Sequence, residues 1–161
     1  KGNIVLINDP YNGVNYVRIG EGINTMTTTK DELHTGDMKY IDIVEAMDAI
    51  REDIHQAFKS GFCGIKKNST DNQALFVGDV NDYFDKLEKE EYGQILEPTY
   101  DNKTEIDVAA QRLAWMDEKS EAVDWDDTKV KNMPFHRNIY LLGDIKINGA
   151  MENMKFKINM N

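Results

Sequence analysis

The sequence predicts an α+β fold in which three helices pack on a small, mainly antiparallel sheet formed by strands from both chain ends, with an extended C-terminal arm. β-rich runs open the chain, three apolar stripes with helical spacing follow, and alternating residues close it. Strands that gather at the ends of a chain favour this class over a parallel βαβ sheet. With 161 residues, 40% of them hydrophobic, the chain is long enough to bury a core.

The first predicted element is a hairpin. Residues 3–7 (NIVLI) and 14–19 (VNYVRI) are rich in β-branched and other apolar side chains, and turn-forming residues separate them. That turn ends in the Asn-Gly pair at 12–13, a strong hairpin signal. Because glycine weakens a strand, we expect Gly20 and Gly22 to end the second strand.

Three helices are predicted in the middle of the chain. Apolar residues recur every three or four positions over 37–58, which indicates one buried helical stripe. A second helix is expected after Ser69 or Thr70, both of which are residue types that cap helices. A third is expected from Thr104, with Asp107 three positions later as a weak capping box.

The chain closes with two alternating segments, residues 139–148 and residues from 154 onward. The final segment either pairs within its own sheet or adds to the edge of another copy, and the pattern alone favours the first. We divide the chain into a body, residues 1–152, and a C-terminal β-arm, residues 153–161.

The charge of the chain excludes some function classes. The net charge of −10 disfavours nucleic-acid binding, which depends on neutralising phosphates. Residues 128–161 hold six basic and two acidic side chains, so a basic tail follows an acidic body, which suits tail-to-body contact within or between copies. We expect no membrane insertion, because no apolar run approaches the length of a span, and we see no secretory leader.

No catalytic signature is present. A single cysteine, Cys63, excludes an internal disulfide framework and a cysteine-based metal cage. The histidines are not spaced as zinc ligands on a helix, and neither a nucleophile elbow nor a phosphate loop occurs. We therefore predict no metal, no cofactor and no enzyme. The alternatives are a small acidic enzyme with a carboxylate site around Asp101, Asp107 and Asp124, or a stand-alone protein-binding module.

Four strings in order carry a family resemblance: IVEAMDAIREDI at 43–54, DNQALFVGDVNDYF at 71–84, EIDVAAQRLAW at 105–115 and DIKINGAMENMKF at 144–156. Together they resemble the C-terminal domain of a contractile-tail sheath protein, as found in myophages and phage-tail-like bacteriocins. The resemblance covers essentially the whole chain. It implies a structural subunit that polymerises around a tail tube and contracts to drive the tube through a bacterial envelope.

The resemblance also implies partners and a location. The partners are other copies of the chain, the tail tube protein, and baseplate and tail terminator proteins. The location is the tail of a virion or a bacteriocin particle, made in the bacterial host cytoplasm. This domain is the inner, tube-facing part of family members, so the chain is expected to be a fragment that lacks an N-terminal arm and outer domains.

Strand exchange between neighbours is implied as well, and it assigns interface residues. The C-terminal arm comprises Met154, Lys155, Phe156, Lys157, Ile158, Asn159 and Met160. The receiving strand is expected to present Ile139, Leu141, Ile145 and Ile147.

A basic patch is the candidate tube contact. Arg51, His55 and Lys59 share one face of the first predicted helix, and Lys66 and Lys67 follow it. Such a patch suits reversible binding to an acidic tube, since contacts between exposed charges are weak and screened by salt. An ordinary solvated helix face is an equally good interpretation of the same residues.

Overall fold

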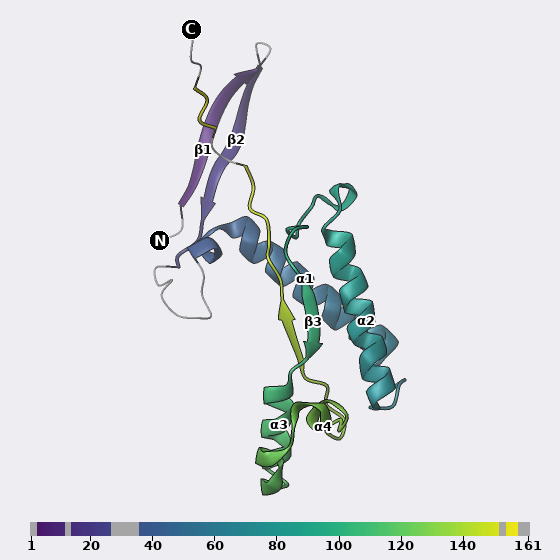
Figure 1. Cartoon of the computed structure of the whole chain (residues 1–161). Helices are drawn as coiled ribbons and strands as arrows, with labels where there is room; N and C mark the ends of the chain where they lie inside the picture. Colours follow the sequence, from purple (N-terminus) through teal and green to yellow (C-terminus); the bar gives the residue numbers. More distant parts are fainter. Residues whose placement is uncertain (1–2, 12–13, 27–35, 152–153, 158–161) are drawn as a thin grey trace. The chain divides into compact units, whose positions relative to one another are not determined.

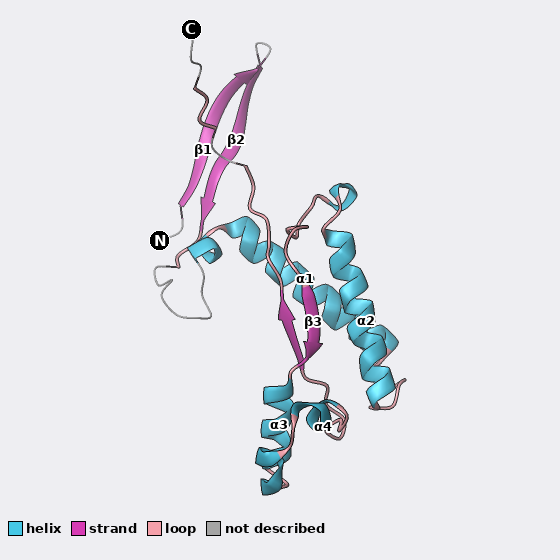
Figure 2. Ribbon diagram, in the orientation of Figure 1, coloured by secondary structure: helices cyan, strands magenta, loops and turns pink. Residues whose placement is uncertain are grey.

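A computed structural model of the chain describes residues 3–11, 14–26, 36–151 and 154–157 (Figure 1). The chain forms two compact units. The first contains Lys1–Ala49 and Ile147–Asn161, and the second contains Ile50–Lys146. Helices and small antiparallel sheets make up the fold, which confirms the α+β class (Figure 2).

The predicted hairpin is confirmed in the first unit, with longer strands than expected. Strands β1 (Asn3–Tyr11) and β2 (Val14–Ile23) pair antiparallel. Val5 pairs with Glu21 and Leu6 with Ile19, so Gly20 is left without a partner in a β-bulge. The prediction that glycines end the second strand at this point is wrong, because the bulge absorbs Gly20 and the ladder continues.

The first predicted helix is confirmed, but it begins later than Asp37. Residues Gly36–Lys39 form the short 3-10 helix η1, and helix α1 runs over Ile41–Gly61. The backbone N–H of Asn24 donates to the carbonyl of Lys39 at 2.8 Å, which ties the end of the hairpin to the start of this helix.

Helix α2 (Thr70–Leu87) begins where the sequence predicts and supplies much of the core of the second unit. The hydroxyl of Ser69 caps it by accepting from the backbone N–H of Asn72 at 3.3 Å. Phe76 is buried, and the rings of Phe58 and Phe62 from the end of α1 lie 5.4 and 4.8 Å from its ring. A short 3-10 turn, η2 (Glu90–Tyr92), follows.

The predicted start of the third helix at Thr104 is wrong. Thr104 lies in strand β3 (Lys103–Ile106), and helix α3 runs over Val108–Met116. The hydroxyl of Thr104 donates across the sheet to the carbonyl of Leu142 at 3.0 Å, so it is not available as a cap. Asp107 caps the helix instead, accepting from the N–H of Ala110 at 2.8 Å.

The acidic stretch after α3 folds around two tryptophans. It contains the 3-10 helix η3 (Ser120–Asp124) and helix α4 (Asp127–Lys131). Trp115, Ala122, Trp125 and Val130 form a buried cluster, with the tryptophan rings 5.8 Å apart. This tight packing makes the stretch part of the body rather than a solvated tail.

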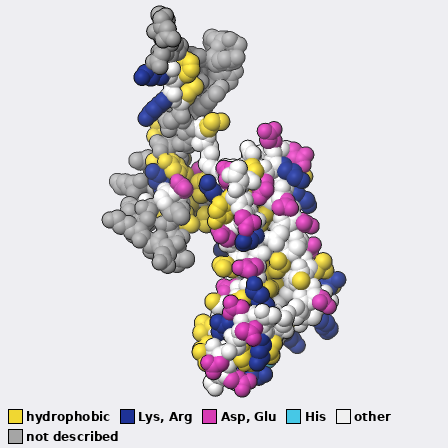
Figure 3. Space-filling model, in the orientation of Figure 1, with side chains coloured by type: hydrophobic (Ala, Val, Ile, Leu, Met, Phe, Trp, Pro, Cys, Tyr) yellow, Lys and Arg dark blue, Asp and Glu magenta, His cyan; other side chains and the backbone are white. Residues whose placement is uncertain are grey.

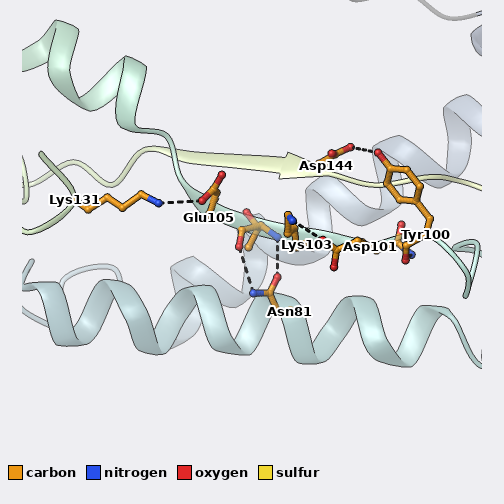
Figure 4. Close-up of polar contacts among 9 residues, drawn as sticks. Asn81, Tyr100, Asp101, Lys103, Glu105, Lys131 and Asp144 are labelled. Atoms are coloured by element: carbon orange, nitrogen blue, oxygen red, sulfur yellow. Dashed lines mark hydrogen bonds and ion pairs between the residues drawn. The ribbon is translucent and has the colours of Figure 1, made fainter. Parts of the chain in front are cut away.

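Strand β4 (Leu141–Asp144) pairs antiparallel with β3. It is shorter than the alternating segment 139–148. The strands therefore form two separate two-stranded sheets, β1 with β2 and β3 with β4. Polar contacts flank the second sheet: Lys131 Nζ lies 3.1 Å from Glu105 Oε2, and the Tyr100 hydroxyl donates to Asp144 at 2.7 Å (Figure 4).

The outer edge of β3 is closed by a side chain of α2. The N–H of Thr104 donates to Asn81 Oδ1 at 2.7 Å, and Asn81 Nδ2 donates back to the Thr104 carbonyl at 3.3 Å (Figure 4). The amide of Asn81 thus makes both bonds that a neighbouring strand would make. Since Thr104 is buried, these bonds satisfy backbone groups that water does not reach.

Replacing Asn81 with alanine is expected to destabilise the chain by about 1–3 kcal/mol, because it leaves the buried N–H and carbonyl of Thr104 unpaired. Urea unfolding followed by circular dichroism measures the change. Asp82→Ala, one position along the same helix at an exposed site, is the control and should change stability by less than about 0.5 kcal/mol. Equal stability of wild type and N81A would contradict the role of Asn81.

Tyr83 is expected to make stability depend on pH in alkaline solution. Burial, together with the 2.6 Å hydrogen bond to Asp53 Oδ2 and the charge of Asp53, raises the pKa of Tyr83 above its ordinary value near 10. The folded chain keeps this proton while the unfolded chain releases it, so the stabilisation is complete below pH 10 and is lost above it. Between pH 8 and pH 11, wild type should lose about 1 kcal/mol more than Y83F in urea unfolding. Parallel losses in the two proteins would refute this.

Candidate subunit interfaces

The β1–β2 hairpin exposes apolar side chains. Leu6 and Ile19 face each other across the two strands and are 64% and 68% exposed, and Val17 is exposed beside them. Figure 3 shows hydrophobic side chains on the surface of this hairpin. In the described part of the chain no third strand joins β1 or β2. An isolated two-stranded hairpin is marginally stable in water, so this sheet is suited to further strands.

The described part of the C-terminal arm has no sheet partner. Met154, Lys155, Phe156 and Lys157 adopt no regular structure, and Met154 and Phe156 are 88% and 78% exposed. Just before the arm, the N–H of Ala150 donates to Asp42 Oδ2 at 3.0 Å, which anchors the chain to the start of α1. Ile158, Asn159 and Met160 lie outside the described residues.

The predicted receiving residues fall on and around β4. Leu141 is the first residue of the strand, whereas Ile139, Ile145 and Ile147 flank it, and all four are partly buried. The strand β3 covers one edge of β4, and over the described residues no strand covers the other edge. β4 is therefore one available edge. The hairpin provides two more, apart from the end of β2, where Ile23 forms an isolated bridge with Tyr40.

The sequence-based prediction does not include the hairpin among the candidate acceptor edges. The signal was present in the run Ile4, Val5 and Leu6, where consecutive apolar residues place side chains on both faces of one strand. All three are exposed in the structure. A strand with two apolar faces in a two-stranded sheet needs cover from elsewhere.

The candidate tube-contact residues belong to the second unit and are exposed. Arg51, His55 and Lys59 recur every four residues on α1, so they share one face of the helix. Lys66 and Lys67 are also exposed, in the segment between α1 and α2. The structure thus presents all five side chains to solvent, as a binding patch requires.

The carboxylates of the alternative enzyme site have separate roles. Asp101 pairs with Lys103, and Asp107 caps α3. Asp124 is exposed at the end of η3. Across the described ranges, no three metal-ligating side chains come together, and no helix is long and apolar enough to cross a membrane.

An apolar hairpin with open edges, and a terminal segment that is unpaired over its described residues, are features of a structural assembly domain. Comparison with known families agrees with this class. The chain belongs to the phage tail sheath C-terminal domain family, which it matches over residues 34–161. It is 26% identical over 145 residues to the tail sheath protein of Clostridium phage phiCD119. That alignment covers 89% of this chain and 39% of the relative, so the chain spans less than half of the relative's length.

Proposed function

We propose that this chain is the assembly domain of a tail sheath subunit, which polymerises around a tail tube by adding strands to the sheets of its neighbours. The observation that carries the proposal is the exposed, open-edged β1–β2 hairpin in a chain of the tail sheath family. Residues 1–152 form the inner body facing the tube, and residues 153–161 form the connecting arm.

In strand addition, the affinity comes from backbone groups and apolar side chains that the arm and its acceptor already expose. Each new backbone hydrogen bond contributes roughly 0.5–1.5 kcal/mol. Met154 and Phe156 gain further by leaving water, in proportion to the apolar area that a neighbour covers. The acceptor is either the hairpin, whose exposed Leu6 and Ile19 complement the arm, or the free edge of β4.

Charge orients this contact. Lys155 and Lys157 are exposed in the arm, while residues 1–127 carry a net charge of −14. A basic arm is therefore attracted to the acidic body of a neighbouring copy. Such complementarity mainly sets the orientation and rate of association rather than its strength.

Contraction then follows from two alternative packings of the bodies. The arms stay joined as hinges while the bodies rotate, and new contacts between bodies in the contracted state supply the energy. This mechanism uses no nucleotide. The further partners are the tube, baseplate and tail terminator proteins, and the location is the tail of a virion or of a related bacteriocin particle.

The basic patch of Arg51, His55, Lys59, Lys66 and Lys67 is proposed to hold the tube. All five side chains are exposed. Contacts between exposed charges are weakened by salt, so the sheath can grip the tube and release it during contraction.

Deleting residues 153–161 from the sheath protein should abolish polymers while leaving the subunit folded, because the deletion removes the added strand and none of the described core. Electron microscopy detects polymer, and circular dichroism with urea unfolding detects the fold. Met151→Ser, which changes a fully exposed residue before the arm, is the control and should still assemble. Polymers from the deleted protein, or its unfolding as a monomer, would refute the role of the arm.

Cross-linking separates the two acceptor edges. In a C63S background, Phe156→Cys is combined with either Ile19→Cys or Leu142→Cys, and assembled protein is treated with a short bis-maleimide. Dimer bands from the Ile19 pair assign the hairpin as the acceptor, and bands from the Leu142 pair assign β4. Dimer bands from neither pair would contradict strand addition.

Binding of the subunit to isolated tail tubes should weaken about tenfold or more between low and high salt, since exposed charges hold the two together. Co-sedimentation measures it. R51E/K59E should bind weakly even at low salt. K86E/K89E makes the same change of charge at the end of α2 and just after it, and should bind like wild type. Salt-independent binding would exclude the patch.

A further inference from the structure

A groove of about 710 Å³ lies in the second unit, between the end of α1, the start of α2 and residues 136–139. The side chain of Asn68 fixes its walls, since Asn68 Nδ2 donates to the carbonyls of Asn138 at 3.0 Å and His136 at 3.2 Å. We call this feature the basic groove, for the charges described below.

The floor of the basic groove is apolar and aromatic. Phe58, Phe62 and Phe76 line it with Ile139, and Ile65 stands exposed at its side. The rings of Phe58 and Phe62 both pack on the ring of Phe76, so the floor is formed before anything binds. A preformed apolar floor suits insertion of one or two apolar side chains from a partner.

The rim of the groove is positively charged. Lys66, Lys67 and Arg137 line it, and none of the residues that line it is acidic. Within the described structure these three cations have no ion-pair partner, whereas His136 beside them is engaged by Glu118 at 2.7 Å. In a chain of net charge −10, a cationic groove selects an acidic occupant.

Helix α3 and the neighbouring η3 expose side chains of the complementary kind, and we call this set of residues the acidic surface. It combines exposed apolar side chains with exposed carboxylates that have no ion pair in the described ranges. Leu113, Met116 and Asp117 lie at i, i+3 and i+4 on one face of α3 and just after it, and Leu113 is 62% exposed. The other members are Val123, Glu121 and Asp124.

We propose that the basic groove of one copy binds the acidic surface of a second copy, with Leu113 or Met116 on the phenylalanine floor and the carboxylates against Lys66, Lys67 and Arg137. This inference rests on the proposed polymer and adds a body-to-body contact to it, for which Lys66 and Lys67 become free once the sheath releases the tube. The two surfaces share no residue, so each copy offers both, and the contact is heterologous and can propagate.

A charge swap tests this pairing in the complete sheath protein without any tube present. K66E/R137E reverses the groove, and D117K/E121K reverses the acidic surface. Sedimentation velocity of each variant alone should show self-association at least about tenfold weaker than wild type, because like charges then meet. An equimolar mixture should recover association, since the reversed groove of one variant matches the reversed surface of the other.

Three further variants separate this contact from strand addition. K86E/K89E makes the same change of charge at exposed sites elsewhere on the body and should associate like wild type. Ile65→Ser and Leu113→Ser change exposed side chains and should weaken association without loss of folding. The groove contact would be overturned if K66E/R137E alone or D117K/E121K alone associated like wild type, or if their mixture showed no recovery. Either result would leave strand addition intact. The groove contact would likewise be overturned if deletion of residues 153–161 abolished polymers and none of the groove or acidic-surface variants weakened them.

Discussion

Pairing of backbone groups at sheet edges is the constraint on which the rest of this structure depends. Both sheets are two-stranded, so each leaves two edges whose N–H and carbonyl groups need partners. The second unit closes one edge of its sheet from within, through the amide of Asn81 on Thr104. Over its described residues the hairpin of the first unit is covered only at its end, where Ile23 bridges to Tyr40, and its Leu6 and Ile19 remain exposed. The edge groups of β3 are thus satisfied within the second unit, whereas most of the hairpin's edge groups have no partner in the described structure.

Asparagine side chains supply many of the hydrogen bonds that satisfy backbone groups inside the second unit. Asn102 is 8% exposed, donates to Glu88 Oε1 at 2.8 Å and to the Glu97 carbonyl at 2.9 Å, and accepts from the N–H of Lys146 at 2.8 Å. One amide therefore joins the end of α2, the loop after it and the segment after β4. Since a side-chain amide offers donors and an acceptor in one rigid plane, it can take the place of a strand partner. The second unit is therefore held together by its own side chains, while other parts of the chain are left to form the proposed links.

The long elements can be predicted from the sequence, whereas the short ones cannot. The stripe over 37–58 and the cap at Ser69 predict α1 and α2, because a long helix repeats its signal over many turns. β3 has four residues, too few for any period, and Thr104 and Asp107 both resemble caps, so only tertiary pairing distinguishes them. The groove cannot be predicted from the sequence for a related reason. Phe62 and Ile139 both line it, but they lie far apart in the chain and come together only after folding.

The two proposed contacts differ in physical type, and that difference suits a sheath that contracts. A strand added to a hairpin is held by many backbone bonds in a fixed register, so it breaks only as a whole and depends little on salt. A contact of Lys66 and Arg137 with carboxylates on another copy is held by exposed charges and a few apolar side chains, so it forms and breaks at low cost. In the proposed contraction, links of the first kind preserve connectivity while contacts of the second kind exchange.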